Sequence, residues 1–309
     1  MKYINYTEFQ LKNSAVSLGK FDGLHLGHRK LFEAIKKEKK NGLTAVVFSF
    51  LLPPGSLLEN KEVTLIYTEE EKKALLEELG MDVLVSYPFD KVSLSMEPEE
   101  FIEEILVKKL DAKLIAVGSD FRFGHNRSGD VALLEKMAQK YGYQLEVFEK
   151  VTLEGDIVSS TRIREALTEG KMELAARLLG EPYSITGEVV HGRKLGRTIG
   201  MPTINIELSK EKALPPNGVY ASLTEIDGKD YAGVTNIGVK PTVGAESFRL
   251  AETYIFDYSG NLYGKELKTN LYAFERSEQK FSSIEELKAQ MEQDCMFGRK
   301  YFLSAANIK

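Results

Sequence analysis

The segment that decides the fold of the first half reads Ser17-Leu18-Gly19-Lys20-Phe21-Asp22-Gly23-Leu24-His25-Leu26-Gly27-His28. It follows a short apolar run, and its histidines are three residues apart, so both imidazoles are expected on one side of a first helical turn. Its glycines let the backbone approach a bulky anion, which the N–H groups and positive dipole end of a helix start attract. The segment therefore predicts a phosphate-binding turn between a strand and a helix. A glycine turn with two surface histidines is the alternative.

Around this turn, apolar runs alternate with amphipathic segments from residue 14 to about residue 180. This alternation is typical of an α/β fold, a parallel sheet covered by helices. Helices are expected to begin at the capping box of Thr68, at Pro98 and at Asp130. Sites in such sheets form beyond the carboxyl ends of the strands, where the histidine turn falls. The predicted strands are Ala15–Leu18, Thr44–Phe50, Val83–Tyr87, Leu114–Val117 and Gln144–Phe148.

After Gly180-Glu181-Pro182 the pattern changes to short alternating strands separated by turns. Hairpin turns are expected at Asp227-Gly228 and at Ser259-Gly260-Asn261. The second half therefore predicts an antiparallel barrel or a compact sandwich, with a closing helix that begins at Ser283-Ile284-Glu285-Glu286. We expect two domains, residues 1–182 and 183–309. The predicted strands are Ile185–Val190, Thr203–Glu207, Val219–Glu225, Tyr231–Ile237, Ala251–Tyr258 and Glu266–Phe274.

The composition is that of a soluble globular protein, with 43% hydrophobic and 28% charged residues. A net charge of -5 argues against a nucleic-acid partner. Cys295 is the single cysteine, which excludes an internal disulfide and a multi-cysteine zinc site. The uncharged residues 42–58 are interrupted by Pro53-Pro54-Gly55 and are expected to form a buried strand followed by a loop, not a membrane span. The N-terminus lacks the apolar core of a secretion signal, so we expect a cytoplasmic protein.

Two further segments carry chemistry. Val158-Ser159-Ser160-Thr161-Arg162-Ile163-Arg164 places hydroxyls before a helix and arginines in its first turn, an arrangement suited to phosphate. A plain serine N-cap with surface arginines is the alternative. The segment from Gly118 to Asp130 mixes aromatic, acidic and basic side chains, which suits a flat heteroaromatic ligand. Alternatively, its phenylalanines pack into the core.

The order of these three segments resembles the adenylyltransferase half of bacterial bifunctional riboflavin kinase/FAD synthetases. They read G-x-F-D-G-x-H-x-G-H, G-x-D-F-x-F-G and S-S-T-x-I-R. The second half is similar to the riboflavin kinase domain of that family. The resemblance there rests on residues 192–205, 233–238 and 240–242, followed by Glu252, Leu262-Tyr263-Gly264 and Arg276. It covers about residues 14 to 302 and implies a Rossmann-like nucleotidylyltransferase domain followed by a β-barrel kinase domain.

For the first half, the resemblance implies attack of the FMN phosphate on the α-phosphorus of ATP, with release of pyrophosphate and formation of FAD. Such a reaction needs alignment and charge stabilisation by positioned donors. The resemblance implies that His25 and His28 handle the ATP phosphates, and that Asp120 and Phe121 lie on the flavin side. The other residues implied at the ATP are Gly19, Phe21, Asp22, Gly23, Gly27, Ser160, Thr161 and Arg164.

For the second half, the resemblance implies transfer of the ATP γ-phosphoryl group to the ribityl 5′-hydroxyl of riboflavin. Glu252 fits the position of the base that accepts the hydroxyl proton, although alone it reads as an outward-facing strand glutamate. Thr203 and Asn205 offer neutral oxygens to Mg²⁺ and line the ATP. The remaining implied residues are Gly192, Lys194 and Gly196 at the nucleotide and Arg276 at the flavin or its phosphate.

The sequence departs from the family pattern at two places. Residues 49–55 read Ser-Phe-Leu-Leu-Pro-Pro-Gly, where a histidine between prolines is expected, and Tyr254 replaces a common histidine. The first change bears on adenylyltransferase substrate binding, and the second on the rate or pH dependence of the kinase. Both activities are nevertheless expected. The implied partners are the small molecules ATP, riboflavin, FMN and FAD, with no nucleic acid, membrane or obligate protein partner.

Three alternatives remain open from the sequence. Only one of the two activities could be retained. A flavin-binding sensor would keep the fold and regulate a partner without turnover. A nucleotidylyltransferase acting on a different phosphate would share the first half, but it leaves the set Thr203, Asn205 and Glu252 without an explanation.

Overall fold

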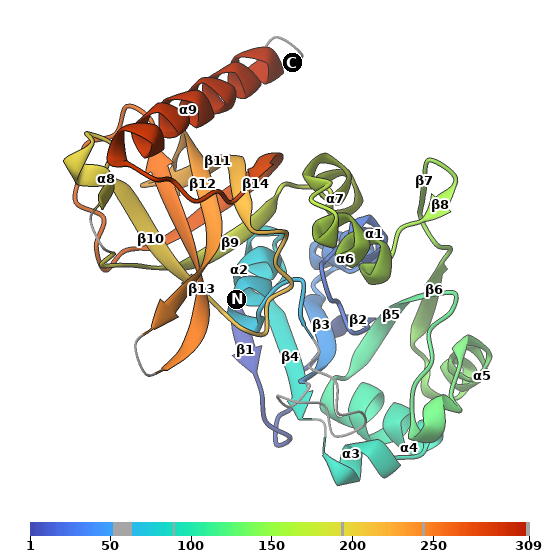
Figure 1. Cartoon of the computed structure of the whole chain (residues 1–309). Coiled ribbons are helices and arrows are strands. Elements are labelled where there is room, and N and C mark those ends of the chain that lie inside the picture. The colour runs from blue at the N-terminus through green and yellow to red at the C-terminus, as the bar shows by residue number, and fades with distance from the viewer. Residues whose placement is uncertain (52–63, 89, 193–194, 243–244, 307–309) are drawn as a thin grey trace. The chain divides into compact units, whose positions relative to one another are not determined.

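The computed structural model describes residues 1–51, 64–88, 90–192, 195–242 and 245–306. Its contacts divide the chain into two compact units, Met1–Ser160 and Thr161–Lys309 (Figure 1). The boundary that we predict at residue 182 lies two helices later in the chain and stays a prediction. Each unit is described by itself below.

The first unit is built on a parallel sheet of six strands in the order β1-β4-β3-β2-β5-β6. The five predicted strands are confirmed, while the short first strand was not predicted. Strands β2 and β5 are neighbours although they are far apart in sequence. The strand order reverses between them, and this is where such sheets bind ligands. The strands are β1 Lys2–Ile4, β2 Ser14–Leu18, β3 Thr44–Leu51, β4 Val83–Pro88, β5 Ala112–Gly118 and β6 Gln144–Phe148.

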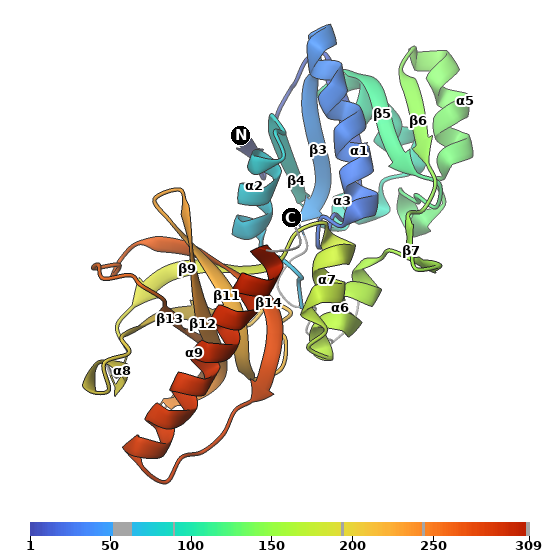
Figure 2. The same ribbon diagram turned by 90° about the horizontal axis from the view of Figure 1, so that it is seen from above.

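Helices cover both faces of this sheet. Alternate side chains of the central strands, such as Val16 and Val46, pack in one core cluster with Ile105 of η2 and Leu134 of α5. Helix α1 contacts β2, β3 and β5, and Figure 2 shows it lying along the sheet. The elements are α1 Leu26–Lys37, η1 Glu38–Asn41, α2 Glu69–Glu78, α3 Lys91–Ser95, α4 Pro98–Glu100, the π-helix η2 Phe101–Lys109, η3 His125–Arg127, α5 Val131–Tyr141, and the small hairpin β7 Thr152–Leu153 and β8 Asp156–Ile157.

The predicted helix starts are confirmed. The Thr68 hydroxyl accepts from the backbone N–H of Glu71, whose carboxylate accepts from the backbone N–H of Thr68, and α2 follows. Asp130 accepts from the backbone N–H of Leu133 and caps α5. Pro98 occupies the first position of α4, where its missing N–H costs no helical bond.

The second unit contains a closed antiparallel barrel in the order β10-β13-β12-β11-β14-β9. The sequence left barrel and sandwich open, and the pairing of β9 with both β10 and β14 closes the barrel. Asp227-Gly228 forms the predicted turn between β11 and β12, with φ of 52° and 77°. The strands are β9 Tyr183–Val190, β10 Thr203–Leu208, β11 Gly218–Ile226, β12 Lys229–Thr242, β13 Ala245–Ile255 and β14 Glu266–Ser277.

The hairpin predicted at Ser259-Gly260-Asn261 is wrong. These residues lie in the connection between β13 and β14, which are not neighbours in the barrel, because each pairs with other strands. Strand β13 also ends at Ile255, before the predicted end at Tyr258. Glycine, serine and asparagine favour any turn, so they mark a long connection as readily as a hairpin.

Helices cover the barrel at two places. Helix α7 contacts β9 and β14, whereas the predicted closing helix α9 contacts β11 and β12. Gly298 permits the close approach of α9, because a Cβ there would lie 2.8 Å from Cγ1 of Val234. The helices of this unit are α6 Ser160–Thr168, which begins at the last residue of the first unit, α7 Met172–Leu179, α8 Leu195–Thr198 and α9 Ile284–Ala306.

Candidate active sites

The histidine turn leaves the carboxyl end of β2, at the reversal of the strand order. His25 caps α1, because its Nδ1 accepts from the backbone N–H of His28 at 3.4 Å. The two imidazoles stack, with ring centroids 3.6 Å apart and planes inclined by 16°. The prediction that both rings lie on one side of a first helical turn is confirmed. Since Nδ1 of His25 is an acceptor, the proton of its neutral ring is on Nε2.

Burial makes both imidazoles neutral. It lowers the pKa of His25 to about 4. It lowers the pKa of His28 well below the ordinary value, and the neighbouring charge of His25 would lower it further. Nδ1 of His28 is buried and has no hydrogen-bond partner among the described residues. The pair can therefore offer N–H donors to an anion without carrying a positive charge at neutral pH.

The backbone of the turn is strained. Phe21, Gly23 and Leu24 all have positive φ, at 49°, 87° and 42°. Non-glycine residues rarely adopt this region, at a cost of about 1–3 kcal/mol each. The ring of Phe21 is fully buried and meets His28 edge-on, with centroids 5.1 Å apart. Gly19 makes room for this ring, because a Cβ there would lie 2.9 Å from it. Strain of this kind is characteristic of a functional turn.

Asp22 holds the turn in place. Its Oδ1 accepts from the backbone N–H of Ile66 at 2.9 Å, and its carbonyl oxygen accepts from the Ser160 hydroxyl at 2.7 Å. The structure thus brings the predicted residue Ser160 to the histidine turn. In these contacts Asp22 holds the backbone around the histidine turn. Gly27 lies beside His25, since a Cβ there would be 3.1 Å from its ring.

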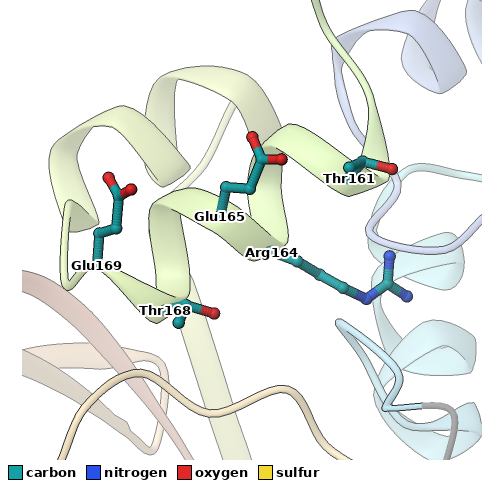
Figure 3. A pocket seen from close by; sticks show the side chains of 5 residues that line it. All are labelled: Thr161, Arg164, Glu165, Thr168 and Glu169. Atoms are coloured by element: carbon teal, nitrogen blue, oxygen red, sulfur yellow. The ribbon is translucent and has the colours of Figure 1, made fainter. Parts of the chain in front are cut away.

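Thr161 and Arg164 follow on α6, in the second unit. They line a pocket of about 310 Å³ together with Glu165, Thr168 and Glu169. Figure 3 shows the Arg164 side chain extending away from the carboxylates of Glu165 and Glu169. The approach of Thr161 and Arg164 to the ATP phosphates stays a prediction.

The segment predicted to face the flavin follows β5, the neighbour of β2. Phe123 is 5% exposed and belongs to the core, so the alternative interpretation is correct for this ring. Phe121 stacks on Phe123, with centroids 5.6 Å apart, and is only partly buried. Asp120 is exposed and pairs with Lys150 at 2.8 Å. The contact of Asp120 and Phe121 with flavin stays a prediction.

In the barrel, three polar residues stand side by side on neighbouring strands. Register pairs Asn205 of β10 with Glu252 of β13, and Glu252 with Asn236 of β12. Directly opposed residues of an antiparallel pair present their side chains on the same face. Thr203 is paired with Tyr254 two residues along the same strands, and therefore on the same face. The predicted set Thr203, Asn205 and Glu252 is therefore brought together.

Asn205 is 4% exposed, and its Oδ1 is buried without a hydrogen-bond partner among the described residues. Gly192 lies against this side chain, since a Cβ there would be 2.6 Å from the amide. Gly196 lies so close to Met201 that a Cβ would collide with its carbonyl oxygen. Lys194 and residues 52–55 lie outside the described residues. An unpartnered buried carbonyl oxygen next to a carboxylate is suited to a cation.

Asn236 was not predicted as a site residue. Its Nδ2 lies 3.5 Å from Oε1 of Glu278, and it completes the row with Asn205 and Glu252. The only signal in the sequence was its place inside the block of residues 233–238. Tyr254, the departure from the family pattern, packs its ring 5.8 Å from Phe256 in the apolar cluster that includes Cys295 of α9.

A pocket of about 390 Å³ lies at the end of the barrel where β9 stops and β10 begins. Its walls present polar and apolar surface in similar amounts, and Thr203 and Thr253 contribute hydroxyls. The hydroxyl of Thr253 is 2.8 Å from that of Thr235 inside the barrel. The lining residues are Val189, Arg197, Pro202, Thr203, Ile204, Thr253, Ile255, Tyr258, Ser259, Gly260, Asn261, Leu262 and Tyr263.

Arg276 fixes α9 to β14 in this structure. Its Nε and Nη2 donate to the two carboxylate oxygens of Asp294, at 2.8 and 2.6 Å. Its Nη1 donates to the carbonyl of Ser277 at 3.1 Å. Burial and the charge of Asp294 raise the pKa of the adjacent Glu275 to about 7, while Arg276 opposes this effect. The contact of Arg276 with flavin stays a prediction.

Comparison with known families also divides the chain into two parts, which correspond approximately to its two units. The family described as FAD synthetase matches residues 8–162, and the family described as riboflavin kinase matches residues 179–302. Three similar proteins are described as bifunctional riboflavin kinase/FMN adenylyltransferases. They come from Buchnera aphidicola (39% identical, 94% of both chains), Escherichia coli (37%, 96% of both) and Bacillus subtilis (38%, 94% of this chain and 92% of the other).

One solved structure is similar over nearly the whole chain. It is a Streptococcus pneumoniae protein described as a macrolide-efflux protein, with a TM-score of 0.82, 29% identity, and coverage of 95% of this chain and 97% of the other. Within the described residues, no helix combines the length and the apolar character that crossing a bilayer requires.

The parallel sheet and the barrel, each with its own polar site, define a two-part nucleotide-dependent transferase. The chain belongs to the bifunctional riboflavin kinase/FMN adenylyltransferase family. It phosphorylates riboflavin to FMN and adenylylates FMN to FAD, with ATP as co-substrate.

Proposed function

We propose that the adenylyltransferase reaction takes place at the histidine turn and the kinase reaction at the row Asn205, Glu252 and Asn236. The stacked neutral histidines at the reversal of the strand order support the first assignment. The unpartnered carbonyl oxygen of Asn205, beside Glu252, is the observation that carries the second.

At the histidine turn, a phosphate oxygen of FMN attacks the α-phosphorus of ATP and pyrophosphate leaves. The protein contributes alignment and charge stabilisation, and it forms no covalent intermediate. His25 donates from Nε2 to a phosphate oxygen, since its Nδ1 is already occupied by the backbone N–H of His28. The free N–H groups at the start of α1 add donors and a favourable dipole. Neutral imidazoles suit this role because they hold ATP without trapping pyrophosphate through a fixed charge.

In the barrel, Glu252 accepts the proton of the riboflavin 5′-hydroxyl as this oxygen attacks the γ-phosphorus of ATP. Asn205 and Thr203 would hold Mg²⁺ through neutral oxygens, and the buried Oδ1 of Asn205 fits this ligand role. When bound, Mg²⁺ would neutralise negative charge on the ATP phosphates. The carboxamides of Asn205 and Asn236 give the Glu252 carboxylate polar neighbours that do not compete for the proton.

The pocket at the barrel end is where we place the nucleoside part of ATP. Thr203 lines this pocket and lies two residues before Asn205 on β10, so a nucleotide in the pocket directs its phosphates towards Glu252. The apolar part of the walls, which includes Val189, Ile204 and Leu262, suits a purine ring.

One experiment tests both assignments. Purified protein is incubated with riboflavin, ATP and Mg²⁺, and FMN and FAD are followed by chromatography. His28→Ala should stop at FMN. Glu252→Gln should lower FMN formation roughly a hundredfold or more, the size of a lost general base, and should still convert supplied FMN to FAD.

Each variant is the control for the other, because each one alters a single activity of a chain that carries both. The assignment fails for the kinase if Glu252→Gln forms FMN at the wild-type rate, and for the adenylyltransferase if His28→Ala forms FAD at that rate. Flavin binding without ATP consumption by the wild type would instead favour the sensor. FMN without FAD, or FAD only from supplied FMN, would indicate a single retained activity.

A further inference from the structure

We propose that Tyr263 is a positioning residue of the kinase site, which fixes the helical turn α8 at the wall of the nucleotide pocket. This inference rests on the proposed place of ATP in that pocket. Tyr263 does not contact the reacting atoms of ATP in this arrangement. It acts through its contacts with His191 and Arg197.

Both neighbours of Tyr263 come from the segment that carries the predicted nucleotide glycines. His191 follows β9 directly, and its ring centroid lies 3.9 Å from that of Tyr263. Arg197 of α8 donates from Nη2 to the Tyr263 hydroxyl at 3.0 Å, with its guanidinium carbon 5.7 Å from the ring centroid. One tyrosine thus contacts this segment before Gly192 and after Gly196.

Hydrogen bonds hold the backbone around Tyr263 in place. Its backbone N–H donates to Oδ1 of Asn261 at 3.2 Å, and the N–H of Gly264 donates to the carbonyl of Val189 at 3.0 Å. The preceding side chain, Leu262, is 3% exposed. The connection is therefore fastened to β9 on one side and to the apolar interior on the other, and it gives Tyr263 a fixed position.

Helix α8 is a single turn of four residues, and a helix this short has little stability of its own. Arg197 and Tyr263 both line the nucleotide pocket with Thr203. The tyrosine hydroxyl therefore fixes one wall of the pocket relative to Thr203, two residues before Asn205 on β10. Ordering this wall before ATP arrives lowers the entropic cost of binding, so the contact should affect KM for ATP more than kcat.

The test measures riboflavin phosphorylation against ATP concentration for wild type, Tyr263→Phe, Arg197→Met and the double variant. Tyr263→Phe keeps the ring and removes only the hydroxyl. Each single variant should raise KM for ATP about 3- to 10-fold, the range expected for one hydrogen bond, with kcat within about twofold. The double variant should be no worse than the poorer single variant, because both substitutions remove the same bond.

Two controls separate positioning from general damage. Conversion of supplied FMN to FAD by the same variants should be unchanged. Tyr272→Phe removes the hydroxyl of a barrel tyrosine that packs against Phe302 of α9, and it should leave KM for ATP unchanged. Hydrogen exchange of the amides of residues 195–201 should be faster in Tyr263→Phe than in wild type.

The inference is overturned if Tyr263→Phe leaves KM for ATP and the exchange of residues 195–201 unchanged, or if the two substitutions act additively. Thr203→Ala distinguishes this failure from failure of the proposed function. If Thr203→Ala impairs the kinase while Tyr263→Phe does not, the site stands and Tyr263 is not its positioning residue. If Thr203→Ala leaves the kinase intact, the site itself is wrongly placed, and the role of Tyr263 falls with it.

Discussion

At the scale of single residues, the histidine pair links binding chemistry to acid stability. His25 is 8% exposed, and its pKa in the folded chain is about 4, below the 6.5 of an unfolded histidine. Between these values the unfolded chain binds the proton more readily, so the free energy of unfolding falls as the pH is lowered through this window. At pH 5 the loss from His25 is about 2 kcal/mol.

We therefore expect His25→Gln to lose less stability than wild type between pH 7.5 and pH 5, by about 2 kcal/mol. Urea unfolding at the two pH values measures this difference. Gln139→Ala is the control, because it changes an exposed side chain of the same unit that carries no titratable group, and it should leave the pH dependence unchanged. An identical pH dependence in His25→Gln and wild type would show that His25 is not held neutral.

Asn205 leads to a second prediction at this scale. A buried polar atom without a partner costs about 1–3 kcal/mol, and leucine has nearly the shape of asparagine. In the absence of nucleotide, Asn205→Leu should therefore unfold at a temperature equal to or above that of wild type. Riboflavin phosphorylation should nevertheless be lost, while supplied FMN is still converted to FAD. A marked fall in the unfolding temperature would show that Oδ1 of Asn205 has a structural partner.

Local signals account for the residues that the sequence identifies. His25 and His28 are three residues apart, so a helix start alone brings their rings together. Asn236 depends on a partner on another strand, and strand register cannot be read from one segment. Tyr263 depends on His191 and Arg197, which are distant from it in sequence. Arg276 shows the reverse difficulty, since its charge suggests a ligand contact but its structural partner, Asp294, is on a different element.

At the scale of elements, two arginine–aspartate pairs fasten α9 to the barrel. Arg276 of β14 pairs with Asp294, whose side chain is 5% exposed. Arg299 of α9 pairs with Asp257, whose side chain is 76% exposed. Both pairs use two nitrogens and two oxygens, so they differ mainly in burial.

Asp294→Asn should lower the free energy of unfolding of the second unit by about 3 kcal/mol, because it leaves a buried guanidinium without its counter-charge. Asp257→Asn, the exposed counterpart, should cost less than about 1 kcal/mol. Urea unfolding compares the two variants, and FAD formation from supplied FMN should persist in both. Equal losses in the two variants would contradict the role that we assign to burial.

Helices and strands were largely predictable where apolar residues recur with a clear period or where capping and turn residues mark the ends. Thr68 and Asp130 marked their helices correctly because their side chains cap within four residues. Strand β1 is three residues long and is stabilised by pairing with β4, a partner distant in sequence. The closed barrel also depends on a distant pairing, that of β9 with β10 and β14, which a local pattern does not specify.

At the scale of the whole molecule, the two proposed sites draw on separate residues. A mixture of His28→Ala and Glu252→Gln chains should therefore form FAD from riboflavin, although neither chain alone does so. FMN released by the first chain is the substrate of the second, so FAD should appear after a lag that shortens as protein concentration rises. Chromatography over time measures the lag, and a mixture of wild type with either variant is the control. FMN that accumulates without FAD would contradict this independence.

The position of α6 has a consequence for any division of the chain into separate products. The boundary between the units falls between Ser160 and Thr161, inside the segment 158–164 that we predict to bind phosphate. A chain divided there would distribute this segment between two products. A split after Leu179 would keep it whole but would strip α7 of its contacts with β9 and β14 and expose four buried apolar residues to water, namely Met172, Ala175, Leu178 and Leu179. Division of the chain at either place would therefore deprive one product of part of the predicted phosphate-binding segment or of the cover over an apolar face.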